Sequence, residues 1–181
     1  MFSLTNFETM KIAFTGAHLV GKTSLAEKLY ESLSDSVFVP EPYVELEEKG
    51  HLFSETPNLE DLTAQLEYAL ERIEIDEPDV IFDRCPLDLL AYMHIIGGAE
   101  ASRSFYLKVK ETMDEIDLLV FVPVETPDRM DCPETEFPKL RKQVNDLLEE
   151  WIDAFDLETI TVKGTLAQRE RQVIETILNF D

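Results

Sequence analysis

Basic residues are scarce in this chain, which has 16 lysines and arginines against 38 aspartates and glutamates among its 181 residues. The formal net charge of −22 repels phosphate backbones at long range, so general affinity for DNA, RNA or an anionic membrane surface is not expected. A single nucleotide is not excluded, because a few local donors and a metal ion can offset the global field. The acidity also has a plainer interpretation, as an aid to solubility or an adaptation to salt.

Cysteine is scarce as well: only Cys85 and Cys132 occur, too few to indicate a disulfide framework. No apolar run reaches the roughly 18 residues that a membrane-spanning helix needs. The segment Met1–Met10 contains Glu8 and no basic residue, so it lacks the positive start of a signal peptide. We therefore expect a reduced, cytoplasmic protein without a membrane segment. None of these features indicates an oligomeric state.

Short apolar runs alternate along the chain with longer segments of helical periodicity. Strands are predicted at Lys11–Thr15, Val37–Val39, Val80–Asp83, Leu118–Val122 and Thr159–Val162. Helices are predicted at 22–33, 58–76, 86–115 with an interruption at Gly97–Gly98, 139–155 and 166–178. The alternation indicates an α/β fold in which a parallel sheet of about five strands has helices on both faces. Because no linker or repeat is recognisable, residues 1–181 are expected to form one domain.

The loop after the first predicted strand reads Gly-Ala-His-Leu-Val-Gly-Lys-Thr and matches Gly-x4-Gly-Lys-[Ser/Thr] at every fixed position. It lies between a buried strand and a helix, where a phosphate-binding loop requires it. Backbone N–H groups and the helix N-terminus are expected to hold the triphosphate of ATP, with Lys22 reaching the β- and γ-phosphates. The predicted nucleotide-binding residues are Gly16, His18, Leu19, Val20, Gly21, Lys22, Thr23 and Ser24. His18 occupies a variable position, where a histidine is more often a loop filler than a catalyst.

A magnesium ion is predicted beside this loop. The Thr23 hydroxyl is the expected first ligand, and a carboxylate at the end of a neighbouring buried strand is the second. The run Val80–Asp83 ends in such an acid, so Asp83 is the candidate. Its alternative is an ordinary surface acid at a strand end.

The residues that follow carry a resemblance to a known family. Asp-Arg-Cys-Pro-Leu-Asp at 83–88, with Ala-Tyr at 91–92, resembles the second signature of small P-loop kinases such as thymidylate and deoxynucleoside kinases. The chain is most similar to the ribosylnicotinamide-kinase-like P-loop ATPase/kinase family over nearly all of residues 10–180. It departs at Cys85, where serine is common, and so loses a hydroxyl. The resemblance implies the three-layer P-loop NTPase fold with a lid segment.

The resemblance also implies catalytic residues. Arg84 would contact the acceptor or the transferred phosphoryl group, and a structural salt bridge beneath the site is the alternative. In the deoxynucleoside kinases a glutamate at the end of the second strand deprotonates the attacking hydroxyl. Glu41, between two prolines, is the matching position here.

The segment 123–138 contains four prolines and no periodicity. We expect it to form part of a lid, at about 123–141, in which Arg129 and Arg141 match the family's lid arginines and stabilise the transferring phosphoryl group. The alternative is a solvated basic helix start. Gly164 matches a loop that borders the adenine in related kinases, although a plain turn explains it equally well. Arg169 and Arg171 are expected on the surface.

We therefore predict a small-molecule kinase that transfers the γ-phosphoryl group of ATP to a hydroxyl of a nucleoside-like acceptor, with Mg²⁺ as cofactor and no nucleic-acid or membrane partner. The main alternative is a P-loop ATPase or nucleotide-dependent switch that acts on a protein partner. A GTPase is disfavoured because the chain lacks Asn-Lys-x-Asp. A nucleotide-dependent binding module without turnover is also disfavoured. Such a module would lack one of the catalytic residues, and this chain has a candidate for each of them. The identity of the acceptor does not follow from these residues.

Overall fold

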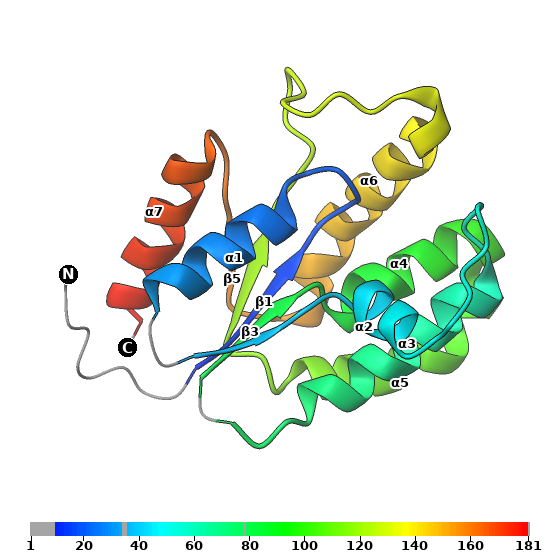
Figure 1. Ribbon diagram of the computed structural model, residues 1–181, viewed down its shortest axis with the longest axis horizontal. Helices are drawn as coiled ribbons and strands as arrows, with labels where there is room; N and C mark the ends of the chain where they lie inside the picture. The colour runs from blue at the N-terminus through cyan, green and yellow to red at the C-terminus, as the bar shows by residue number, and fades with distance from the viewer. Residues whose placement is uncertain (1–9, 34–35, 78, 181) are drawn as a thin grey trace.

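The computed structural model describes residues 10–33, 36–77 and 79–180. Within these ranges five strands form one parallel sheet in the order β2-β3-β1-β4-β5 (Figure 1). The strands are β1 (Lys11–Thr15), β2 (Val37–Val39), β3 (Val80–Asp83), β4 (Leu118–Phe121) and β5 (Thr159–Thr161). The predicted parallel sheet is confirmed. The sequence predicts that the segment 1–10 is not a signal peptide. Apart from Met10, that segment lies outside the described residues.

Helices cover both faces of this sheet, as predicted. On one face, α1 (Lys22–Ser32) packs against α7 (Leu166–Leu178). On the other, α4 (Pro86–Gly97) packs against three further helices. These are α3 (Leu59–Ile73), α5 (Ala99–Met113) and α6 (Pro138–Phe155), with α2 (Pro42–Glu48) beside α3. The sheet and its two helical layers make the three-layer arrangement expected from the sequence.

Burial explains the sequence patterns of the central elements. Phe14 in β1, Phe82 in β3 and Leu119 in β4 are each at most 2% exposed. Strands covered on both faces read as continuous apolar runs, because no side of the strand meets water. In α4 every residue from Pro86 to Met93 is buried, so this helix also lacks an amphipathic stripe.

One helix was not predicted. The sequence predicts no regular structure directly after the strand at 37–39, but Pro42 occupies the first turn of α2, with Glu41 as the N-cap residue. Proline is favoured there because its missing N–H would have no partner within the helix. A 3₁₀ turn, η1 (Glu134–Glu136), also lies in the proline-rich segment 123–138, for which no regular structure was expected. The other element boundaries match the prediction or differ from it by at most three residues.

The strand order places a ligand crevice beside β1. The chain leaves β1 for β2 on one side, returns through β3, and then crosses to β4 on the other side of β1. Ligands bind at such a reversal, outside the carboxyl ends of the strands. The loop that starts at Gly16, the acid Asp83 and the N-cap Glu41 all follow the carboxyl ends of neighbouring strands. The predicted site residues therefore emerge at one edge of the sheet.

None of the helices in the described part of the chain is both long and apolar enough to cross a lipid bilayer.

Candidate active site

The loop between β1 and α1 curls through backbone conformations that L-residues avoid. Leu19 has φ 52°, Gly21 has φ 87° and Gly16 has φ 146°. A Cβ added at Gly16 would collide with the carbonyl oxygen of Val122, so glycine is required at that position. Leu19 adopts its left-handed conformation in spite of its side chain. Positive-φ residues interspersed with ordinary ones make the backbone concave, so that successive N–H groups point to one side. Such a concave backbone binds anions.

Lys22 lies inside the site at the start of α1. Its residue is only 6% exposed, and Nζ donates to the carbonyl oxygen of Ala17 at 2.7 Å. Burial first, and then the nearby Arg84, lower the pKa of Lys22 to about 8 against the opposing attraction of Asp88 and Asp83. A buried ammonium group short of compensating charge favours an anion, which is the role expected of this lysine.

Asp83 and Thr23 fit the expected magnesium site. Asp83 is 2% exposed, and burial raises the pKa of its carboxyl while a hydrogen bond from the Thr23 side chain opposes that rise. Oδ1 of Asp83 is buried and has no hydrogen-bond partner among the described residues. In those residues no group of three or more His, Cys, Asp or Glu side chains could hold a metal by itself. A hard oxygen-ligated ion such as Mg²⁺, which binds through one or two protein oxygens plus phosphates and water, suits this donor set.

Arg84 lies between two carboxylates. Its Nε is 3.2 Å from Oε2 of Glu41 and 3.5 Å from Oδ2 of Asp88. Burial disfavours the charge on Arg84, but Asp88 and Glu41 outweigh burial and hold its pKa above the ordinary value. Arg84 has φ 90°, a strained conformation for a residue with a side chain, and its guanidinium lies 5.6 Å from the centre of the Tyr92 ring. The structure therefore brings Arg84 and Glu41 together, as both predicted roles require.

Cys85, which departs from the family pattern, has a structural role at the start of α4. Cys85 is the N-cap of α4, and its N–H donates to Oδ1 of Asp88 at 3.1 Å. Burial is the largest influence on the thiol and raises its pKa far above the ordinary value, so it remains uncharged. The capping box with Asp88 is complete, and serine is not needed for it.

Arg141, predicted as a lid arginine, binds the outer side of the phosphate loop. It is 4% exposed, and it donates from Nε to the carbonyl oxygen of His18 at 2.9 Å and from Nη2 to that of Leu19 at 2.8 Å. Its guanidinium also makes an ion pair with both carboxylate oxygens of Asp128. The side chain is thus bound to the loop from the beginning of α6.

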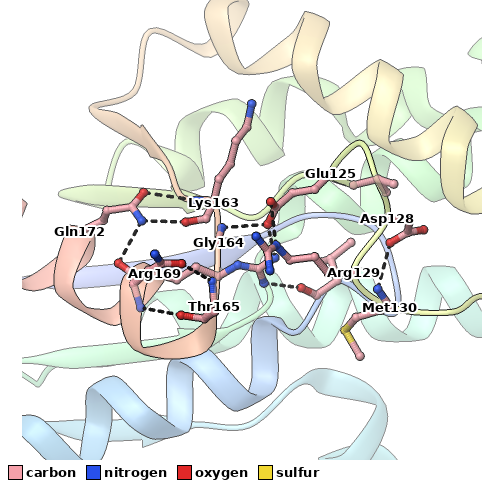
Figure 2. A network of polar contacts seen from close by, with 12 residues as sticks. Glu125, Asp128, Arg129, Met130, Lys163, Gly164, Thr165, Arg169 and Gln172 are labelled. Atoms are coloured by element: carbon pink, nitrogen blue, oxygen red, sulfur yellow. Dashed lines mark hydrogen bonds and ion pairs between the residues drawn. The ribbon is translucent and has the colours of Figure 1, made fainter.

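Arg169 was expected on the surface, and that prediction is wrong. The residue is 7% exposed because its guanidinium lies under the phosphate loop, where Nη1 donates to the carbonyl oxygen of Val20 at 2.6 Å. Nη2 donates to Oε1 of Glu125 at 2.7 Å, and the N–H of Gly164 donates to the same oxygen at 3.0 Å (Figure 2). Arg129 donates to the other oxygen of Glu125 at 2.9 Å, and its side chain is 46% exposed.

These three donors determine the charge state of Glu125. Burial would raise its pKa, but the hydrogen bonds from Arg169, Gly164 and Arg129 outweigh burial and lower the pKa to about 2. Glu125 is therefore a carboxylate under all ordinary conditions. Its side chain joins the proline-rich segment to the loop before α7 and to Arg169 of α7 (Figure 2), and Arg169 in turn bonds to the phosphate loop.

His18 connects the phosphate loop to η1. Its Nε2 lies 2.6 Å from the carbonyl oxygen of Glu136, which can only accept, so Nε2 carries the proton. Nδ1 then accepts from the Tyr92 hydroxyl at 2.6 Å, and the hydroxyl oxygen accepts from the His18 N–H at 2.7 Å. Burial is the largest influence on His18 and lowers its pKa, aided by Arg84, Lys22 and Arg141. The contacts with Tyr92 and η1 show that this histidine holds two segments together.

The remaining predicted residues lie where the loop leads into α1. Thr23 and Ser24 are exposed residues in the first turn of α1, and the Thr23 side chain bonds to Asp83. Sequence reasoning gave no role to Asp88, Glu125, Asp128 or Arg169. The i, i+4 spacing of Arg84 and Asp88 was a usable signal. The contact between Glu125 and Arg169 joins residues 44 positions apart, and no pattern in the sequence signals it.

Comparison with known proteins shows what the chain as a whole is similar to. The model of a family described as AAA domain matches residues 11–169. No curated protein sequence matches the chain. Among solved structures, a deoxyadenosine kinase from M. mycoides with dCMP and dCDP matches with a TM-score of 0.65 and 14% identity, covering 94% of this chain and 100% of the other. A thymidylate kinase from Ehrlichia chaffeensis matches with a TM-score of 0.60 and 19% identity, covering 94% and 99%.

The NadR protein in complex with NR matches with a TM-score of 0.73 and 18% identity over 95% of this chain. This chain spans about half of that protein, 52% of its length. At such identities the likeness concerns the fold, and it confirms the expected resemblance to small P-loop kinases.

Proposed function

The chain belongs to the AAA domain family, and from that membership and the site geometry we propose that it is an ATP-dependent phosphotransferase. The proposed reaction transfers the γ-phosphoryl group of ATP to a hydroxyl of a nucleoside-like small molecule. The acceptor oxygen attacks the γ-phosphorus, and its proton passes to the carboxylate of Glu41. The bond between the γ-phosphorus and the bridging oxygen breaks, and ADP leaves.

The observation that carries the proposal is the meeting of four charged groups at neighbouring strand ends. The buried ammonium of Lys22 follows β1, the buried Asp83 ends β3, and Arg84 bonds to Glu41 after β2. Phosphoryl transfer depends mainly on positioning and on charge stabilisation, and these groups supply both. Asp83 and the Thr23 hydroxyl would hold Mg²⁺, which when bound neutralises charge on the β- and γ-phosphates.

The acceptor class rests on similar folds. The deoxyadenosine kinase, the thymidylate kinase and the NadR protein share this arrangement of strands and helices, and the first is described with dCMP and dCDP bound. A fold shared with such proteins supports a nucleoside-like acceptor but does not identify one. The excess of carboxylates over basic residues in the chain also favours a small acceptor over a polynucleotide.

We propose further that residues 123–141 act as a lid in this one domain and that Arg129 is its catalytic cation. Arg129 is half exposed and bonds only to Glu125 among the described residues, so its guanidinium can turn toward a bound triphosphate at small cost. The loop at Gly164, whose N–H is anchored by Glu125, is the proposed border of the adenine.

A second candidate is a P-loop ATPase that acts on a protein partner, which the family's description as an AAA domain favours. The two candidates differ in what stimulates ATP consumption. We would measure ADP formation with a panel of nucleosides, nicotinamide riboside and nucleoside monophosphates, using Lys22→Ala as the control. A sharp rise with one acceptor, which gains about 80 Da by mass spectrometry as one phosphoryl group is added, supports the kinase. Slow hydrolysis regardless of the acceptor supports the ATPase instead.

A further inference from the structure

Four successive carbonyl oxygens of the phosphate loop, those of residues 17 to 20, are bound by cationic side chains. Lys22 bonds to the carbonyl of Ala17 from within the loop. The carbonyls that follow are bound by arginines from two other helices. Arg141 of α6 bonds to those of His18 and Leu19, and Arg169 of α7 bonds to that of Val20.

These bonds determine where the loop's N–H groups point. In a planar trans peptide the C=O of one residue and the N–H of the next point in opposite directions. Carbonyls held outward at 18, 19 and 20 therefore turn the N–H groups of residues 19, 20 and 21 inward, toward the anion site. The conformation is not the loop's own preference, since Leu19 is left-handed with φ 52°. An external restraint is needed to keep it.

We propose that Arg141 and Arg169 are positioning residues that preform the phosphate loop, and that Glu125 and Asp128 act through them by holding the two guanidinium groups in place. This inference rests on the proposed function, because it concerns how the same site binds a triphosphate. Glu125 and Asp128 both belong to the proline-rich segment, so one stretch of four residues secures both restraints. Gly21 lies against this assembly: a Cβ there would sit 3.3 Å from Nη1 of Arg169.

The positioning role and simple electrostatics predict opposite changes in triphosphate affinity when Glu125 or Asp128 is removed. Glu125 and Asp128 are acids close to a site for a triphosphate, so their negative charge alone would weaken binding. Removal of either acid should then strengthen binding if charge were all that mattered. If the acids position the arginines, removal frees a guanidinium, releases the carbonyls of the loop and weakens binding.

The test uses inorganic tripolyphosphate and ATP, each titrated calorimetrically in the presence of Mg²⁺ into the full chain. Tripolyphosphate has no base or ribose, so its affinity depends on the phosphate loop and not on contacts between the adenine and the loop at Gly164. The variants are Glu125→Ala, Asp128→Ala and the control Asp131→Ala. Asp131 is an exposed acid of the same segment, so its removal deletes the same charge without touching either arginine.

We expect Glu125→Ala and Asp128→Ala each to weaken tripolyphosphate binding by at least about tenfold, the effect of losing hydrogen bonds to charged groups. The control should stay within about twofold of the wild type. Unchanged or tighter binding by both variants would overturn the inference. Asp128 is exposed, so its variant remains informative if Glu125→Ala does not fold. Failure of the wild type to bind either ligand would instead overturn the proposed function.

A second measurement separates positioning from general loosening of the fold. Amide hydrogen exchange of residues 19–21 in the free protein should be faster in Asp128→Ala than in Asp131→Ala, while exchange in β1 and β4 remains equal. Arg141→Lys should restore part of the affinity lost in Arg141→Ala, because an ammonium can bond to one of the two carbonyls. Equal exchange at 19–21 in the two acid variants would contradict the positioning role.

Discussion

Arg84 donates from Nε to Oε2 of Glu41 at 3.2 Å, although the two residues are 43 positions apart and follow different strands. The pair connects the proposed base to the motif that begins with Asp83. Asp88 lies 3.5 Å from the same nitrogen and is fully buried, so Arg84 is held from both sides. Glu41 consequently has one defined position at the entrance to the crevice, which a proton acceptor in phosphoryl transfer requires.

Glu41→Gln should lower kcat by about 10²- to 10³-fold, because a general base typically contributes an effect of this size. The KM for ATP should stay within about threefold, since Glu41 belongs to the acceptor side. The matched control is Glu45→Gln in the same helix, whose carboxylate pairs with Arg72 at 3.5 Å outside the proposed site. Equal turnover in wild type and Glu41→Gln would remove Glu41 from the mechanism.

Lys22→Met should abolish triphosphate binding and yet stabilise the free protein. The ammonium is buried and its pKa is lowered to about 8, so the folded state holds this charge at a cost near neutral pH. Its removal should raise the free energy of unfolding by about 1–3 kcal/mol, the equivalent of that pKa shift with allowance for lost contacts. Urea unfolding at pH 7 measures the change. A less stable variant would show that Lys22 is a structural residue.

His18 makes stability depend on pH below neutrality. Its pKa is lowered from 6.5 by burial, so the unfolded chain binds a proton more readily than the folded one. Stability contributed by neutral His18 is therefore present above about pH 6.5 and is lost as the pH falls below it. The wild type should lose more free energy of unfolding than His18→Gln between pH 7.5 and 5.5. Parallel losses in the two proteins would contradict this assignment.

Arg129→Ala and Arg141→Ala should separate catalysis from stability. Arg129 makes an exposed ion pair worth about 0–1 kcal/mol, so its removal should leave Tm nearly unchanged while kcat falls about 10²-fold or more. Arg141 is buried with bonds to two carbonyls and Asp128, so its loss should cost about 3 kcal/mol and lower Tm by several degrees. Thermal unfolding and steady-state kinetics on both variants provide the check. A large loss of Tm in Arg129→Ala would make that residue structural.

Much of the fold could be predicted because it depends on local patterns. The runs at 11–15, 80–83 and 118–121 are apolar because both faces of those strands are covered, and the helices show their periodicity wherever one face meets water. Helix α2 was missed because a proline such as Pro42 can end a strand or begin a helix, and only the backbone around it distinguishes the two. The roles of the predicted site residues remain predictions.

The sequence by itself determined the phosphate loop, the succession of strands and of all helices except α2 and the 3₁₀ turn η1, and the family, since each depends on residues that are close together in the chain. Tertiary structure alone decided which charges meet. Arg169 reaches Val20 across 149 positions and Arg141 reaches His18 across 123. With 38 acids in the chain, spacing could not select Glu125 or Asp128 as their partners. Buried guanidinium groups need carboxylates and carbonyls around them, and only the packing of α6 against α4 and of α7 against α1 shows which ones they find.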